Sequence, residues 1–209
     1  MHSSLGRVAV LTAVVAALTL GGCSSSDEAP TAAAPSSTSA TPAAPVPTGP
    51  FGPACASVSA DGDTTFAGIA GAPFVTAAGS QPALSRLVEA VTTATLVDTL
   101  NNSGGVTILA PVNGAFDALP AADVQALLAD PARLTRVLTH HVIAGTLGPG
   151  QLAGTHVTQA GDQVTITGSG ETFTVSPTLS GAPAAVVCGN VRTANATVYY
   201  VDQVLAPAQ

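Results

Sequence analysis

The sequence predicts an α+β fold, because two different hydrophobic periodicities occupy two parts of the chain. Between residues 80 and 141, apolar side chains recur every three or four positions, as on one face of a helix. From residue 164 onward they alternate with polar side chains, as in half-buried strands. A run rich in β-branched residues, Val106 to Ile108, predicts a buried strand among the helices.

Residues 1–22 have the pattern of a bacterial targeting segment. Arg7 precedes an apolar run from Val8 to Leu20, which is short for a permanent membrane-spanning helix. Leu20-Gly21-Gly22-Cys23 then matches the lipobox, in which the cysteine is acylated and becomes the first residue. An ordinary secretory signal cut nearby is the alternative. We predict that Cys23 carries the lipid and anchors the chain to the membrane.

Residues 23–50 continue as a predicted tether. From Ala29 to Pro50 the chain is almost only Ala, Pro, Ser and Thr, which lack the side chains needed to offset the entropy of ordering. In an extended, polyproline-like form, Ser24 to Pro50 would reach on the order of 80 Å at about 3.1 Å per residue. Its Ser and Thr beside Pro make it a candidate for O-glycosylation, with disorder alone as the simpler reading.

The folded domain is expected over residues 51–209. Cys55 and Cys188 are the cysteines that remain after Cys23. In an exported protein such a pair favours a disulfide over two buried thiols, and the bond would tie the beginning of the domain to its far end.

The stretch from Val106 to Phe116 organises the domain. After the turn signal at residues 102–105, a buried strand should run to Pro111, which cannot donate to the ladder. Asn113 can accept from the free amides of the next turn, so we expect it to cap a short helix that carries Phe116 onto the sheet.

Helices are predicted on both sides of this stretch. Leu84, Leu87 and Val91 form one apolar stripe, and Leu96 to Leu100 continue as a shorter helix. Pro120 opens another helix, and Asp130-Pro131 ends it and caps the next. That last helix buries Leu134, Val137 and Leu138 and runs into His140-His141.

Strands follow in the last part of the chain. Residues 164–166 and 173–175 predict a hairpin around Gly168-Ser169-Gly170, and residues 186–193 predict a second hairpin around Gly189-Asn190. The final strand covers Asn195 to Asp202. Tyr199 and Tyr200 should point to opposite faces of it, one to the core and one to solvent.

Three motifs resemble the fasciclin (FAS1) family, and in particular its single-domain mycobacterial and actinobacterial lipoproteins and secreted antigens. They are Thr107 to Phe116, Leu138 to Val142, and Asn195 to Leu205, in the family's order and spacing. The resemblance covers residues 51–209 and implies a β-sheet wedge packed against a bundle of short helices. It also implies adhesion, with the histidine motif, here His140 and His141, as the candidate binding residues.

The chain departs from the family pattern at two positions. Val112 stands where Thr is usual, so helix capping there should rest on Asn113. His140 stands where Tyr is usual, before the motif histidine. We interpret His141 as a hydrogen-bonded core residue rather than a ligand or base, and expect His140 to point the other way. Asn113, Phe116 and Asn195 form the predicted structural motif.

The composition of the chain limits the classes of function and partner that are plausible for it. The net charge is −7 with no lysine, and beyond Arg7 four arginines face twelve acids, which counts against nucleic acid as a partner. We find no metal-ligand spacing, nucleophile elbow or nucleotide-binding glycine motif, so no metal, cofactor or catalytic residue is predicted. The expectation is a monomeric, non-enzymatic, extracytoplasmic adhesion module, lipid-anchored with partial release, for a protein or glycan partner. The alternative is a lipoprotein that binds a small ligand or glycan.

Overall fold

The computed structural model describes residues 47–58 and 65–207. Predictions for the targeting segment, for Cys23 and for most of the tether concern residues outside this part of the chain. In the described part, no helix is long and apolar enough to cross a membrane.

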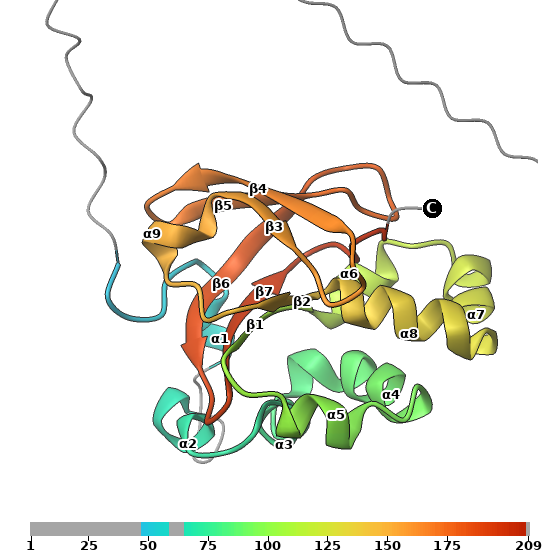
Figure 1. Ribbon diagram of the computed structural model, residues 1–209, viewed down its shortest axis with the longest axis horizontal. Helices are drawn as coiled ribbons and strands as arrows, with labels where there is room; N and C mark the ends of the chain where they lie inside the picture. The colour runs from blue at the N-terminus through green and yellow to red at the C-terminus, as the bar shows by residue number, and fades with distance from the viewer. Residues whose placement is uncertain (1–46, 59–64, 208–209) are drawn as a thin grey trace, which may run out of the picture. The chain divides into compact units, whose positions relative to one another are not determined.

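A seven-stranded mixed sheet forms the frame of the domain (Figure 1). Its spatial order is β2-β1-β7-β6-β5-β4-β3. The β1–β7 pair is parallel and the other neighbours are antiparallel. A bridge between Ile143 and Thr158 brings the two ends of the sheet together. The strands are β1 Val106–Pro111, β2 Val142–Ala144, β3 Gly154–Val157, β4 Gln163–Ser169, β5 Thr172–Ser176, β6 Ala184–Arg192 and β7 Ala196–Val201.

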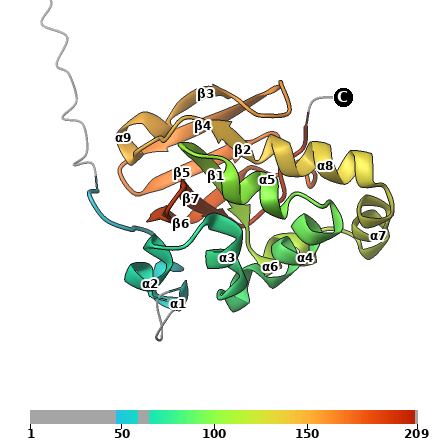
Figure 2. The same cartoon turned by 60° about the horizontal axis from the view of Figure 1, so that its bottom comes forward.

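Short helices cover one side of this sheet, and Figure 2 shows most of them together on that side. The predicted α+β class is therefore confirmed. The helices are α1 Cys55–Val58, α2 Phe66–Ala70, α3 Phe74–Gly79, η2 Pro82–Leu84, α4 Ser85–Thr93, α5 Val97–Asn102, α6 Asn113–Asp117, α7 Ala121–Ala129, α8 Pro131–His140 and α9 Pro149–Leu152.

Local signals in the sequence account for several of these elements. The predicted helices over α4, α5, α7 and α8 are confirmed, as is the β4–β5 hairpin. Asp130 caps α8 as expected, because its carboxylate accepts hydrogen bonds from the amides of Ala132 and Arg133. No element was predicted for α1 to α3, β2, α9 or β3.

The core has two parts, one on each face of the central strands. Val198 and Tyr200 of β7 join the cluster beneath the helices, while Tyr199 and Val201 join a second cluster inside the curled sheet. Tyr199 and Tyr200 are thus both buried, and the prediction that one faces solvent was wrong. A strand covered on both faces has no wet side, so the alternation separates two cores rather than core from solvent.

The predicted hairpin around Gly189-Asn190 was also wrong. Residues 184–192 form one strand, β6, with register shifts against β7. Asn190 has φ +57°, which produces an irregularity within the strand and not a reversal. Gly189 exchanges backbone hydrogen bonds with Phe51, and a Cβ there would lie 2.5 Å from the Phe51 ring. The glycine therefore allows close approach of Phe51 rather than a turn.

Candidate functional site

The two longer motifs lie side by side at the centre of the sheet. β1 and β7 pair in parallel from Val106 opposite Ala196 to Pro111 opposite Val201. The amide of Val112 continues the contact by donating to the carbonyl of Val201 at 3.0 Å. The two motifs therefore form the centre of the sheet. A binding surface has to be formed by the residues that surround this centre.

The predicted disulfide is confirmed. Cys55 in α1 is bonded to Cys188 in β6, at a sequence separation of 133 and with their Cα atoms 4.9 Å apart. Both cysteines are buried beside the helical core. The bond fastens the first helix of the domain to the centre of the sheet.

Asn195 joins three separate segments through its side chain. Its Oδ1 accepts from the amide of Phe74 at 2.8 Å, at the start of α3, which has no cap of its own. Its Nδ2 donates to the carbonyls of Leu100, Asn101 and Ser103, at the end of α5. One amide group thus satisfies free backbone groups of two helix ends at once.

The predicted capping role of Asn113 was wrong. The N-cap of α6 is Val112, whose side chain offers no acceptor, and Asn113 is the first helical residue. The Asn113 side chain points instead to the start of α4. Its Oδ1 accepts from the amide of Arg86 at 3.1 Å, and its Nδ2 donates to the carbonyl of Pro82 at 2.8 Å and to the Ser85 hydroxyl. Asn113 therefore ties two helices together.

Phe116 follows on α6 and is buried as predicted. It lines a small crevice of about 80 Å³ with apolar residues of α4 and α7, while Arg86 and Glu89 stand at the rim. Arg86 pairs there with Asp117 at 2.8 Å, and both side chains are about half exposed. Such an exposed pair adds little stability.

His141 is a core residue, as interpreted from the sequence. Its side chain is 3% exposed, with Nδ1 2.7 Å from the carbonyl of Val137 and Nε2 3.0 Å from the amide of Leu205. A carbonyl only accepts and an amide only donates, so the proton sits on Nδ1 and the ring is neutral. Burial lowers its pKa to about 4, with the Val137 hydrogen bond opposing this and the neighbouring His140 adding to it.

His140 is equally buried, contrary to expectation. Its side chain is fully enclosed, and Nδ1 lies 2.6 Å from a carboxylate oxygen of Asp162. Asp162 also accepts from the Thr158 hydroxyl, in the turn between β3 and β4. The turn covers the end of α8, which is why both neighbouring histidines are inside. Neither predicted binding residue presents its ring to a partner.

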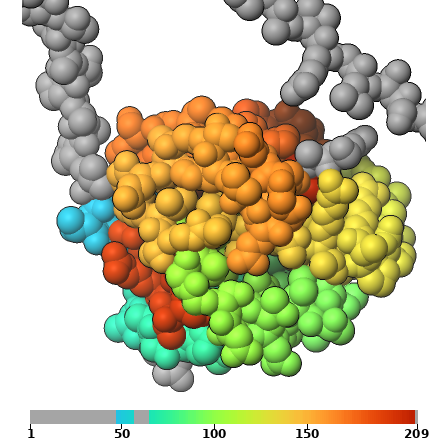
Figure 3. Space-filling model, in the orientation of Figure 1, coloured from blue at the N-terminus to red at the C-terminus, as the bar shows by residue number. Residues whose placement is uncertain are grey.

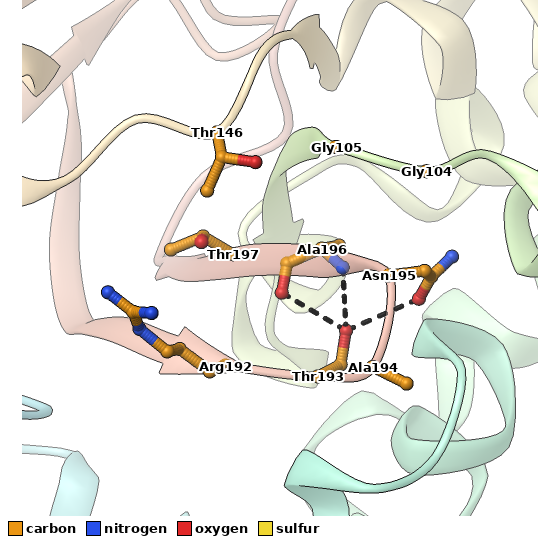
Figure 4. Close-up of a pocket in the computed structure, with 9 residues that line it drawn as sticks. All are labelled: Gly104, Gly105, Thr146, Arg192, Thr193, Ala194, Asn195, Ala196 and Thr197. Carbon is orange, nitrogen blue, oxygen red and sulfur yellow. Dashed lines mark hydrogen bonds between the residues drawn. The ribbon is translucent and has the colours of Figure 1, made fainter.

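An open groove lies at the edge of the sheet where β1 and β7 begin (Figure 4). Its volume is about 360 Å³. In Figure 3, the surfaces of three segments meet in this region. The lining comes from the loop before β1, the loop after β2, and the turn from β6 into β7, namely Gly104, Gly105, Thr146, Arg192, Thr193, Ala194, Asn195, Ala196 and Thr197.

Most polar groups on the turn are already engaged. The Thr193 hydroxyl bonds to the backbone of Ala196 and to Asn195, which holds the turn in shape. Within residues 47–58 and 65–207, the side chains of Arg192, Thr146 and Thr197 form no hydrogen bond or ion pair, so these three face the groove with unused donors. Sequence reasoning missed them. The available signal was the scarcity of cations, since Arg192 is one of only four arginines beyond residue 22.

The described residues contain no group of three or more His, Cys, Asp or Glu side chains arranged to hold a metal ion. Burial raises the pKa of Tyr199, although the Arg192 guanidinium opposes the rise, and Tyr199 donates to the carbonyl of Leu147 at 2.9 Å. Burial likewise raises the pKa of Tyr200 to about 12. Both phenols therefore stay neutral in ordinary conditions.

Comparison with known proteins places the chain in a family. A model of the Fasciclin domain matches residues 82–207. Cell surface glycolipoprotein MPB83 of Mycobacterium bovis is 42% identical over 165 residues, covering 75% of this chain and 72% of the relative. Immunogenic protein MPB70 of the same species is 42% identical over 164 residues, covering 75% and 81%.

Two further similarities are more distant. Protein sll1483 of Synechocystis is 35% identical over 134 residues, covering 63% of this chain and 71% of its own. The FAS1 domain pair of the insect cell adhesion molecule Fasciclin I aligns with 59% of this chain and 45% of its own, at 24% identity and a TM-score of 0.49. On the strength of the family model and the mycobacterial relatives, the chain belongs to the fasciclin domain family.

Proposed function

We propose that this protein is a non-enzymatic interaction module of the cell surface, held outside the cytoplasmic membrane by acylated Cys23. The observation that carries the proposal is its 42% identity to a cell surface glycolipoprotein over most of both chains. The lipobox ending at Cys23 supports the lipid anchor independently. Residues 23–50 then act as the tether that holds the domain away from the membrane.

The geometry of the domain supports binding rather than catalysis. Four ionisable side chains of the motifs, His140, His141, Tyr199 and Tyr200, are buried, and the half-buried Asp202 accepts from the amide of Ala185. They are held by backbone or partner groups of the fold, or lie in its core. The open groove beside Arg192 combines hydroxyls and a guanidinium without a carboxylate or imidazole to act as a base. The groups that another molecule can contact are therefore those on the surface of the domain.

The anchor is tested by membrane fractionation of a lipoprotein-processing host that expresses the full chain. Cys23→Ser should move the protein from the membrane to the soluble and secreted fractions, because the acyl chains supply most of the membrane affinity. Ser26→Ala, three residues away, should remain with the membrane as the matched control. A Cys23→Ser chain that stays membrane-bound would place the anchor elsewhere.

The binding role is tested with the Cys23→Ser full chain on arrays of glycans and matrix proteins. Saturable retention by the folded chain, lost after reduction and unfolding, is the expected result. Turnover of an arrayed glycan or ester by the folded chain would contradict the proposal and favour an enzyme.

A further inference from the structure

The groove at the start of β1 and β7 carries a positive charge in an acidic protein. The chain has twelve acids against five basic residues, yet the groove lining contains Arg192 and no Asp or Glu. Arg86, on α4, is already paired with Asp117. Within the described ranges, Arg192 has no carboxylate partner. This groove is therefore a place where the domain can receive an anionic group.

Hydroxyl groups stand beside this charge. Figure 4 draws Thr197 between Thr146 and Arg192, on the same side of the turn. Thr197 is only 3% exposed, so its side chain belongs to the floor rather than the rim. The other residues of the wall have a methyl side chain or none, namely Gly104, Gly105, Ala194 and Ala196. The groove thus combines a fork of guanidinium donors with two hydroxyls that can donate or accept.

The floor has a fixed shape. Asn195 is held by its bonds to α3 and α5, and the amide of Gly105 donates to the Asn195 carbonyl at 3.0 Å. The Thr193 hydroxyl fixes the turn from within. A site whose backbone is already ordered loses less entropy when a ligand binds.

From these contacts we propose that the groove binds a sugar unit that carries one oxyanion group, either the carboxylate of a uronic acid or a phosphate ester. Arg192 donates two parallel N–H hydrogen bonds to the oxyanion. Thr146 and Thr197 exchange hydrogen bonds with the sugar hydroxyls. The inference rests on the proposed function, because it names the partner chemistry of an interaction module.

Size and polarity favour a sugar over a peptide. A volume of about 360 Å³ is near the lower end of the roughly 300–1,000 Å³ that small-ligand sites occupy. The wall has no apolar pocket for the side chains of a peptide, and its small residues leave room for a hydroxylated ring. No aromatic residue lines the groove to stack on the ring, so a single sugar unit should bind weakly.

The test is a titration of the isotope-labelled Cys23→Ser full chain followed by amide chemical shifts. The ligands are methyl glucuronide, glucose 1-phosphate and, as the neutral control, methyl glucoside. The two anionic sugars should shift the amides of Gly104, Ala194 and Ala196 with a Kd on the order of 1 mM. The neutral sugar should not saturate. Whichever anionic sugar binds more tightly identifies the source of the oxyanion.

Substitutions separate the site from general charge effects. Arg192→Gln should weaken anionic-sugar binding by about tenfold or more, because the charge-assisted pair is lost. Arg192→Lys should retain part of the affinity, since it keeps the charge but not the fork. Arg133→Gln, which removes an exposed charge on α8, is the matched control and should bind like the wild type.

Several results would overturn the groove assignment: equal binding of methyl glucoside, unchanged binding by Arg192→Gln, or tighter binding of an acidic dipeptide at the same amides. These failures differ from failure of the proposed function. If Arg192→Gln keeps its affinity for the anionic sugars while the chain is still retained by an array partner, the interaction module stands and the sugar site falls.

Discussion

The amide of Leu205 donates a hydrogen bond to Nε2 of His141 across 3.0 Å, joining the end of the third motif to the end of the second. The same ring donates from Nδ1 to the carbonyl of Val137 in α8. The ring therefore bridges a helix and the chain that leaves the sheet. Protonation of Nε2 would place a second donor against the Leu205 amide, so this bridge depends on a neutral histidine.

A pH dependence of stability follows from His141. Its pKa is about 4 in the folded chain and ordinarily 6.5, so the unfolded chain takes up the proton first. The stability that His141 provides is complete above pH 6.5 and is lost as the pH falls from about 6.5 to about 4. The loss should be about 3 kcal/mol at the acid end. Urea melts between pH 4 and pH 8 measure it.

The control must remove the contribution of the carboxylates, which also titrate in acid. His141→Gln should unfold more easily at pH 7 and lose less stability on acidification than the wild type. Parallel curves for wild type and His141→Gln would show that His141 does not sense the pH.

A second prediction concerns His140, which, from the sequence, we expected to point away from the core side of His141. Because the ring is fully enclosed and bonded to Asp162, His140→Ala should cost about 2 to 4 kcal/mol through a cavity and an unpaired carboxylate. A double-mutant cycle with Asp162→Asn should give a coupling of about 1 kcal/mol or more. Additive effects of the two substitutions would mean that the pair contributes nothing jointly.

Asn113 and Val112 provide a third prediction, with reasons that differ from those suggested by the sequence. Asn113→Ala removes the bonds between α6 and the start of α4 and should cost about 1 to 2 kcal/mol in urea melts. Val112→Thr supplies the missing acceptor at the N-cap of α6 and should be neutral or stabilise by up to about 1 kcal/mol. An Asn113→Ala chain as stable as the wild type would remove Asn113 from the helix contact.

The disulfide provides a fourth prediction. Thiol labelling of the unfolded, unreduced Cys23→Ser chain should find neither Cys55 nor Cys188 free. Replacing both by Ala should lower stability by up to about 4 to 5 kcal/mol, because the bond closes a long loop in the unfolded chain. Two labelled thiols, or a double variant that melts like the wild type, would contradict this contribution.

The sequence by itself determined the features that depend on neighbours in the chain. The cap of α8 was predictable because Asp130 reaches amides two and three residues ahead. The β4–β5 hairpin and the strand β1 were predictable because periodicity and turn residues act locally. The motifs identified the family, and the pairing of Cys55 with Cys188 followed from how few cysteines the chain has.

Only the tertiary structure decided which distant groups meet. Asn113 bonds to residues 27 to 31 positions away, and Asn195 caps helix ends more than 90 positions away, so no local pattern could reveal either partner. Tyr200 and His140 are buried because the helices and the β3–β4 turn arrive from elsewhere in the chain. The Arg192 groove exists for the same reason. Its walls come from three segments that are far apart in the sequence, and hydrophobic periodicity says nothing of how they meet. Only the packed sheet brings them together.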